Sequence, residues 1–496
     1  MPPCPRAKAL PALWTHRAGA AAGDALRSGS HTFLEDCVRD HGDPFTLRLP
    51  GEPLRLVTGD PALIKQVFAL SPDDYEQRTA SFPLNIGERS LLFLDGEEHR
   101  RDRHVMMPPL HGERLRGYVA SMREVTARAV SRFTVGSVQP LHALFQEITL
   151  DVILHCVFGV SGGETAKRLR RALLGWMNGS LTPLTFFASM IFTPTRVRHF
   201  LDEAAHDSLQ RAAGGRDPGR TRILPWQRWA DDKAYVLALL RDEVLRCRGG
   251  NGLSAARTDV LALLARARYE DGELMPLDDV VDELVTLLVG GHETTANTLA
   301  WTLYHLLAHP AALERARDES RAGAAAAARA EGVPFLDAAI KESMRLTPIA
   351  PAVSRNLRRP LRLGAYDVPA GTILWPCVYL AHRRPEVWPE PSRFRPERFL
   401  ERTPAPSEFL PFGGGRRACI GMAFASMEMR VVLAELLARV QLRLVPGARV
   451  RPEFRGITIA PSNDLRAIVD GVEDEGRGGD GNAKGQRAQR TRLLSA

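Results

Sequence analysis

Residues Pro411–Gly421 read PFGGGRRACIG, so a single cysteine, Cys419, stands in a loop of glycines and arginines. The segment that follows, 420–440, has the apolar periodicity of an amphipathic helix, which places the Cys419 sulfur near a helix N-terminus. Free N–H groups and the helix dipole favour a thiolate at such a position. The thiolate can serve as a catalytic nucleophile, as part of an anion site or as an iron ligand. A phosphate-binding loop is excluded, because no Lys-Ser or Lys-Thr follows the glycines.

The composition is that of a soluble globular protein. Hydrophobic residues make up 44% of the 496 residues and charged residues 25%, which excludes a disordered or fibrous chain. Residues 1–29 lack both the apolar core of a signal peptide and the roughly 20 apolar residues of a membrane span. We therefore expect a cytoplasmic protein with no membrane span.

Cysteine and charge patterns exclude two further classes. The six cysteines are scattered without a CxxC pair, so neither a disulfide framework nor a zinc site is expected. The formal net charge is +8, but the arginines are spread along the chain beside almost as many acids, and no nucleic-acid reading motif accompanies them. We therefore expect no nucleic-acid partner. A basic surface that docks an acidic protein is favoured instead.

Hydrophobic periodicity predicts a mainly α protein with small β-sheets. Segments 44–51 and 52–59 alternate like the two strands of a hairpin around Pro50-Gly51, and 61–70 follows with a helical pattern. Residues 110–320 are helical in pattern almost throughout.

The domain organisation is predicted from composition. Residues 1–29 form an extension, 30–470 a single domain, and 471–496 a disordered tail, because the tail is glycine-rich and charged with few apolar residues. The alanine-rich stretch 321–332 is predicted to be a helix or connector without chemistry.

Residues 276–310 predict one helix of about 30 residues, about 45 Å long, that crosses the whole protein. The helix begins with two aspartates, Asp278 and Asp279, and ends at His309-Pro310. Its apolar residues lie on nearly every face, which predicts a buried central helix. The charged residues that interrupt the apolar run argue against a membrane span.

The middle of this helix is unusual. Gly290 and Gly291 each cost about 1 kcal/mol relative to alanine, and the polar run 292–295 follows at once. Missing side chains let a flat ligand approach the backbone, while threonine hydroxyls can bond back to carbonyls and locally open the helix. The alternative is a pair of glycines that serve only helix packing.

A second helical segment, 335–348, places Glu342 and Arg345 three residues apart on one face, where they can form an ion pair. Most such pairs are solvated surface contacts, so this one gains meaning only from its context.

The cysteine loop fits the pattern F-x-x-G-x-R-x-C-x-G at every fixed position, and here the sequence resembles the cytochrome P450 family of heme-thiolate monooxygenases. Further motifs agree with this family in order and spacing over residues 30–465. The matching positions are Phe412, Gly415, Arg417, Cys419 and Gly421 in the loop, Glu342 and Arg345 as an ExxR pair, Arg398 of FRPERF, the GGHETT segment 290–295, and His99 and Arg103 of DGEEHRRDRH.

The resemblance implies the cytochrome P450 fold, with the long helix over a heme and the cysteine loop beneath it. Heme b, iron protoporphyrin IX, is the expected cofactor, with Cys419 as the axial thiolate that pushes electron density onto iron. The glycines 413–415 are expected to let the backbone pass close to the porphyrin. The two propionates need cations around them. The resemblance assigns this role to His99, Arg103, Arg355 and Arg417, and a structural role to Glu342, Arg345 and Arg398.

On the opposite side of the heme, the resemblance assigns Thr294 to the oxygen-bound water network and Glu293 to proton delivery. The implied reaction inserts one oxygen atom from O2 into an apolar small molecule. The alternative is the same fold acting as an oxygen-independent isomerase or dehydratase, or as a peroxygenase. Such variants often lose the pair Glu293-Thr294, which favours the monooxygenase.

The substrate pocket is expected to be apolar and to accept a fatty acid, terpenoid or polyketide-like molecule. The resemblance places Ile86, Phe93, Phe186, Gly290, Val353 and Ile459 in it.

Electrons are expected from outside the chain, because no flavin or nicotinamide module and no iron-sulfur cysteine set occurs. A separate ferredoxin with its ferredoxin reductase is the simplest donor, and Arg100, Arg101 and Arg416 are candidates to bind it. We expect the chain to act as a monomer.

Overall fold

The computed structural model describes residues 32–48, 53–76, 86–160, 162–180, 203, 225–249, 256–322, 332–455 and 458–473. This part of the chain is mainly helical with small sheets, which confirms the predicted fold class. Its α-helices are α3 Thr32–His41, α4 Pro61–Phe68, α5 Gly96–Met106, α6 Arg114–Val130, α7 Leu141–Cys156, α8 Gly163–Ser180, α11 Pro225–Arg248, α12 Val260–Ala265, α13 Leu277–Ala308, α14 Pro310–Ala322, α15 Pro334–Leu346, α16 Val378–Ala381, α17 Arg398–Glu401 and α18 Met422–Arg439.

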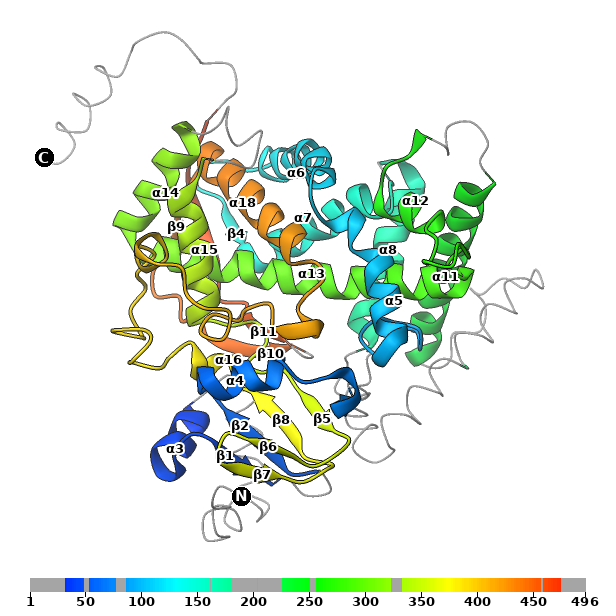
Figure 1. Cartoon of the computed structure of the whole chain (residues 1–496). Helices are drawn as coiled ribbons and strands as arrows, with labels where there is room; N and C mark the ends of the chain where they lie inside the picture. The colour runs from blue at the N-terminus through cyan, green and yellow to red at the C-terminus, as the bar shows by residue number, and fades with distance from the viewer. Residues whose placement is uncertain are drawn as a thin grey trace, which may run out of the picture.

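The largest described sheet has five strands in the order β1-β2-β8-β5-β3. Strands β1 and β2 are antiparallel, which confirms the predicted N-terminal hairpin, whereas β2 and β8 run parallel. Figure 1 shows this sheet with α3 and α4 below the helical body of the molecule. The strands are β1 Phe45–Leu47, β2 Arg55–Thr58, β3 Tyr75–Glu76, β4 Val138–Pro140, β5 Arg355–Leu357, β6 Leu361–Leu363, β7 Tyr366–Val368, β8 Ile373–Pro376, β9 Val440–Leu444, β10 Pro452–Arg455, β11 Thr458–Pro461 and β12 Arg466–Val472.

The helix α13 crosses the middle of the molecule (Figure 1). It has 32 residues and is therefore about 48 Å long, which confirms the predicted central helix. Asp278 and Asp279 lie in its first turn, and it ends at His309, before Pro310. The helix packs against α7, α11, α15 and α18, which explains why apolar residues cover nearly all of its faces.

Helix α4 is a support for the cysteine loop. Its start is fixed by Asp60, whose carboxylate accepts hydrogen bonds from the N–H groups of Ala62 and Leu63 at 2.7 and 3.1 Å. Pro61 occupies the first turn, where its missing N–H costs nothing. The last residue, Phe68, reaches the glycines before Cys419.

The C-terminal strand β12 extends beyond the predicted domain boundary at residue 470. Gly471 and Val472 pair with Gln441 and Val440 of β9, so two residues assigned to the tail belong to a sheet. The extension 1–29, the rest of the tail, and 323–331 of the alanine-rich stretch lie outside the described residues. No helix of the described part of the chain is long and apolar enough to cross a membrane.

Candidate heme site

Backbone hydrogen bonds give the cysteine loop its shape. The Cys419 N–H donates to the Phe412 carbonyl at 2.9 Å, and the residues between them form a 3-10 turn, η6, over Gly415–Arg417. Gly415 has a φ of 65°, a conformation that other residues adopt only at a steric cost. Gly421 is the N-cap residue of α18. The loop therefore presents Cys419 just before a helix N-terminus, as the sequence predicted.

The glycines of this loop also have a packing role that the sequence did not reveal. A Cβ atom on Gly414 would overlap the ring of Phe68, and one on Gly415 would overlap the Phe68 carbonyl oxygen. The close approach that these two glycines permit is thus to the end of α4. The expected approach to a porphyrin remains a prediction.

The Cys419 side chain is exposed, whereas the other cysteines of the described residues are buried or half-buried. Protein atoms nevertheless surround the Cys419 sulfur closely, and this desolvation raises the pKa of its thiol. The Gly421 N–H and the charge of Arg103 lower the pKa of this thiol, but the increase from desolvation is larger. Desolvation by the surrounding protein therefore opposes the thiolate that the helix start favours. A metal cation bound at the sulfur would supply the missing stabilisation.

Four basic side chains meet at one edge of the site. His99 and Arg103 come from α5, Arg355 from β5 and Arg417 from η6. Burial, followed by the charges of Arg417, Arg103 and Arg355, lowers the pKa of His99 to about 3. Burial also lowers the pKa of Arg355 to about 10 and that of Arg103 and Arg417 below its ordinary value. An anion placed among these groups would be stabilised.

The arginines of this cluster are oriented by backbone carbonyls. Arg417 donates to the carbonyls of Leu91, at 3.1 Å, and Leu94, and to the carboxylate of Asp95 at 2.5 Å. Arg355 donates to the Gly414 carbonyl at 3.2 Å, which links it to the cysteine loop. The cluster of four basic residues, called the basic rim below, is therefore connected to the cysteine loop.

Tyr75 is a residue of this edge that the sequence analysis missed. Strand β3 pairs with β5, and the Tyr75 ring lies 5.2 Å from the Arg355 guanidinium. Tyr75, His99, Arg103 and Arg417 all line one cavity of about 260 Å³. A phenol can donate a hydrogen bond to a carboxylate. No sequence signal identifies Tyr75, because a strand of two residues carries no motif and only pairing with β5 brings it here.

These residues fit a heme. The accessible Cys419 thiol offers one ligand, and the neighbouring cations match the two carboxylates of a porphyrin. No cluster of three or more His, Cys, Asp or Glu able to hold a metal ion occurs in the described ranges. A single protein thiolate suits a heme iron, because the porphyrin supplies further ligands to the iron.

Behind the cysteine loop, Glu342, Arg345 and Arg398 meet in the interior. The Glu342 carboxylate accepts from Nε and a terminal nitrogen of Arg345 at 2.7 and 2.9 Å, and from Arg398 Nε at 3.0 Å. It also accepts from the backbone N–H of Arg395 at 2.8 Å. All three side chains are buried, so the pair predicted between α15 residues is not a surface contact. It fixes α17 and the segment before it to α15.

The glycines of α13 have different surroundings. A Cβ on Gly290 would meet no atom within 4 Å, whereas one on Gly291 would lie 3.4 Å from the Ile153 side chain of α7. Gly290 thus faces open space, and Gly291 serves helix packing. Thr294 donates its hydroxyl to the Gly290 carbonyl at 2.5 Å, the predicted back-bond. The helix remains α-helical through this segment, so the local opening that we expected does not occur.

Glu293 is turned toward α7. Its carboxylate accepts a hydrogen bond from Gln146 Nε2 at 2.9 Å, and His142 Nε2 lies 3.6 Å from its other oxygen. Burial raises the pKa of Glu293, but the nearby donor groups of His142 and Gln146, together with the His142 and His292 rings, outweigh it and lower the pKa to about 2. Glu293 is therefore ionised at neutral pH. Sequence motifs did not identify either α7 partner.

The predicted pocket residues have mixed surroundings. Ile86 and Ile459 are buried, and Phe93 is half-buried. Val353 lies beside the cysteine loop, since a Cβ on Gly413 would be 3.5 Å from its side chain. Phe186 lies outside the described residues.

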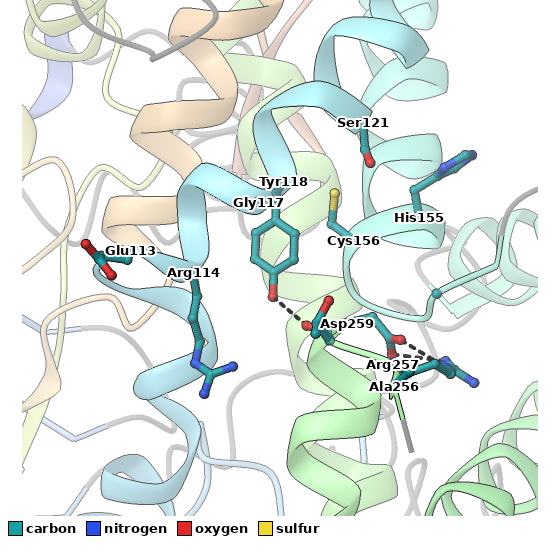
Figure 2. A pocket seen from close by; sticks show the side chains of 12 residues that line it. Glu113, Arg114, Gly117, Tyr118, Ser121, His155, Cys156, Ala256, Arg257 and Asp259 are labelled. Atoms are coloured by element: carbon teal, nitrogen blue, oxygen red, sulfur yellow. Dashed lines mark hydrogen bonds and ion pairs between the residues drawn. The ribbon is translucent and has the colours of Figure 1, made fainter. Parts of the chain in front are cut away.

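A larger cavity, of about 490 Å³, lies away from these groups between α6, α7 and the start of α12 (Figure 2). Its wall includes Arg257, which donates to Asp259 at 2.7 Å and to the Phe158 carbonyl at 2.9 Å, and Tyr118, whose hydroxyl points to the Thr258 carbonyl. None of the predicted site residues lines it. The Arg257 bonds connect α12 to the end of α7, which indicates a structural role.

Comparison with known proteins agrees with these observations. The cytochrome P450 family model matches residues 11–465. Cytochrome P450 135B1 of Mycobacterium tuberculosis is 34% identical over 451 residues, which cover 90% of this chain and 89% of the relative. Cytochrome P450 138 of the same organism is 32% identical over 433 residues, which cover 87% and 90%. The solved structure of cyanobacterial CYP120A1 with bound retinoic acid has a TM-score of 0.71 at 20% identity and covers 89% of this chain and 94% of its own, which shows the shared fold.

The family match extends over residues 11–465, which is nearly the whole chain. The chain belongs to the cytochrome P450 family of heme-thiolate monooxygenases.

Proposed function

We propose that this enzyme inserts one oxygen atom from O2 into an apolar small molecule, with electrons supplied by a separate redox protein. The observation that carries the proposal is the combination of an accessible Cys419 thiol with an acid and a hydroxyl, Glu293 and Thr294, next to the open face at Gly290. An isomerase or dehydratase has no need for an acid and a hydroxyl that manage protons at bound oxygen.

The bound heme would supply oxygen activation at iron, favoured by electron density from a thiolate. Cys419 would hold the iron, with its sulfur near the Gly421 N–H, which tunes the charge on the ligand. His99, Arg103, Arg355 and Arg417 would bind the propionates, and the Tyr75 hydroxyl would add a donor. Glu342, Arg345 and Arg398 would hold the segments on the cysteine side of the heme together.

Proton management would be the task of α13. The Thr294 hydroxyl, held by the Gly290 carbonyl, would orient water in the open space beside that glycine. Glu293 is ionised and would receive protons from the α7 side and pass them to this water. A Glu293→Gln substitution would keep the shape of the side chain and remove its ability to bind and release a proton.

The substrate would be apolar, with a fatty acid, a terpenoid and a polyketide-like compound as candidates. The predicted pocket residues Ile86, Phe93, Val353 and Ile459 would contribute aliphatic and aromatic groups; Ile86 and Ile459 are buried in the structure. Gly290 would leave room for the reacting carbon, because it presents no side chain.

A ferredoxin with its reductase would deliver the electrons to the basic face near α5 and η6. Arg100 and Arg416 are exposed there, although Arg100 also forms an ion pair with Glu97 at 2.6 Å. Arg101 is engaged by Asp102 at 3.2 Å and by the Tyr269 ring at 4.0 Å. Docking through exposed charges weakens with salt, so turnover at limiting ferredoxin should fall as ionic strength rises. Turnover that is insensitive to salt would contradict this docking surface.

The decisive experiment is a carbon monoxide difference spectrum of the reduced protein. Thiolate ligation should give the red-shifted absorption band, Cys419→Ala should abolish it, and Cys37→Ala should leave it unchanged as a matched cysteine control. Spectral titration with fatty acids and terpenes would then select a compound for turnover. Equal product formation without oxygen and without reductant would refute the monooxygenase and favour an isomerase or dehydratase.

A further inference from the structure

Four residues form a closed ring of hydrogen bonds beside Glu293, which is completed through the backbone carbonyl of Arg455. They are His142 of α7, Asn297 of α13, Arg455 of β10 and Thr458 of β11, and none belongs to a motif used to identify the site. His142 and Asn297 are buried. The residues are brought together by packing of the β10-β11 hairpin and α7 against α13.

The direction of each bond in the ring follows from its chemistry. Arginine can only donate, so His142 Nδ1 accepts from Arg455 at 3.1 Å and carries no proton. The proton of the neutral imidazole must then be on Nε2, which donates to Asn297 Oδ1 at 2.7 Å. Asn297 Nδ2 donates to the Thr458 hydroxyl at 3.1 Å, and that hydroxyl donates to the Arg455 carbonyl at 3.0 Å. The directions of these four bonds are mutually consistent, which fixes one tautomer of His142.

This tautomer directs the only N–H of His142 toward Glu293. The Asn297 oxygen accepts this N–H at 2.7 Å, while the Glu293 oxygen lies 3.6 Å from Nε2, just beyond hydrogen-bond distance. Gln146, one turn further along α7, donates to the second carboxylate oxygen at 2.9 Å. A small rotation of the imidazole or the carboxylate would transfer the N–H from Asn297 to Glu293.

We propose that His142 is the positioning residue of Glu293: Arg455 fixes its tautomer, so that its only N–H lies on the Nε2 edge that faces the carboxylate and can pass from Asn297 to Glu293 by a small rotation. The proposal rests on the proposed function, since it concerns the proton-delivering role of Glu293. The titratable and charged groups around the carboxylate are His142 of α7, His292 of α13 itself and, behind His142, Arg455 of β10. Arg170 of α8 acts on His292.

The ring also connects the acid to a predicted pocket element. Thr458 is adjacent to Ile459, whose backbone N–H donates to the Ile349 carbonyl at 3.0 Å and whose carbonyl accepts from Trp301 of α13 at 3.2 Å.

The first test is the protonation state of Glu293 in the heme-loaded protein, read from the infrared carboxylic acid band that Glu293→Gln removes. The wild type should show no such band at neutral pH. In His142→Leu the band should titrate above the ordinary glutamate value of about 4.3, because burial remains and a donor is lost. His142→Gln retains an N–H donor and should resemble the wild type, and His155→Leu is a control on the same helix. An absent band in His142→Leu at about pH 4.3 would overturn the proposal.

The second test is the tautomer of His142, read from imidazole ¹⁵N shifts of the reduced carbon monoxide complex. The wild type should show a protonated Nε2 and a bare Nδ1, and Arg455→Met should give a mixture. An unchanged tautomer in Arg455→Met would refute the role of Arg455, and this variant answers the question even if His142→Leu fails to fold. Neither readout needs turnover. If Glu293→Gln left the coupling of oxygen use to product unchanged, the proposed function of Glu293 would fail while the positioning could still be verified.

Discussion

Removing the Glu342 charge should destabilise the protein far more than removing a surface charge with the same geometry. The Glu342 carboxylate is fully buried and accepts four hydrogen bonds, two from Arg345, one from Arg398 and one from the Arg395 backbone. In Glu342→Gln, one acceptor oxygen becomes an NH2 group that faces guanidinium donors, and two buried cations lose their counter-charge. Breaking a buried pair in this way costs about 3–5 kcal/mol.

A cost of this size is a large fraction of the 5–15 kcal/mol that stabilises a typical protein, so it should be plain in urea denaturation followed by the heme absorption band and by far-ultraviolet circular dichroism. The matched control is Glu97→Gln. Glu97 also pairs with an arginine three residues later, Nε to Oε2 at 2.6 Å compared with 2.7 Å in the buried pair, but its side chain is 81% exposed. The control should cost less than about 1 kcal/mol. Equal effects of the two substitutions would refute the reasoning that burial gives the Glu342 cluster its importance.

Three further predictions concern Arg355, Glu293 and the buried His305. Arg355→Leu should speed heme loss to apomyoglobin by about 10- to 100-fold, the equivalent of one charge-assisted hydrogen bond, and an unchanged rate would remove Arg355 from the propionate site. Glu293→Gln should retain the carbon monoxide band yet divert most of the electrons into hydrogen peroxide, and tight coupling to product would contradict its proton-delivery role. Burial and the charges of His309 and Arg345 lower the pKa of His305 to about 3. Between pH 6.5 and about 3, His305 is therefore protonated in the unfolded chain but neutral in the folded protein. Stability should therefore fall as the pH falls through this window, by about 1.4 kcal/mol per pH unit for this histidine, and His305→Phe should reduce that slope in urea titrations, whereas an equal slope would contradict its neutral burial.

Local patterns predicted the elements of the fold well, because their causes are local. The length of α13 follows from its continuous apolar pattern and the proline after it, and the start of α18 follows from the apolar segment beyond Gly421. The prediction that this second helix is amphipathic is wrong, because α18 is buried on most of its faces. The motif around Cys419 forms a tight loop with a 3-10 turn, and Glu342 and Arg345 form the ion pair that their spacing on one helical turn predicts. Such patterns report backbone periodicity and motif spacing directly.

Tertiary structure adds contributions to the electrostatics that the sequence does not contain. The start of α18 suggested a lowered pKa for Cys419, yet the atoms packed around the sulfur raise it, because desolvation depends on neighbours from the whole fold. The glycines before Cys419 likewise owe part of their necessity to Phe68. The β12 boundary was misplaced because Gly471 looks like a linker in sequence and is paired with β9 only in the sheet.

The sequence by itself therefore determined the family, the cysteine ligand, the central helix and the residue types of the rim. Only the tertiary structure decided which partners complete them: Tyr75 beside Arg355, and His142 with Arg455 beside Glu293. The physical reason is that these contacts join residues far apart in the chain: His142 lies 155 positions from Asn297 and 313 positions from Arg455. Local periodicity does not predict such contacts, because they form only when α7 and the β10-β11 hairpin pack against α13.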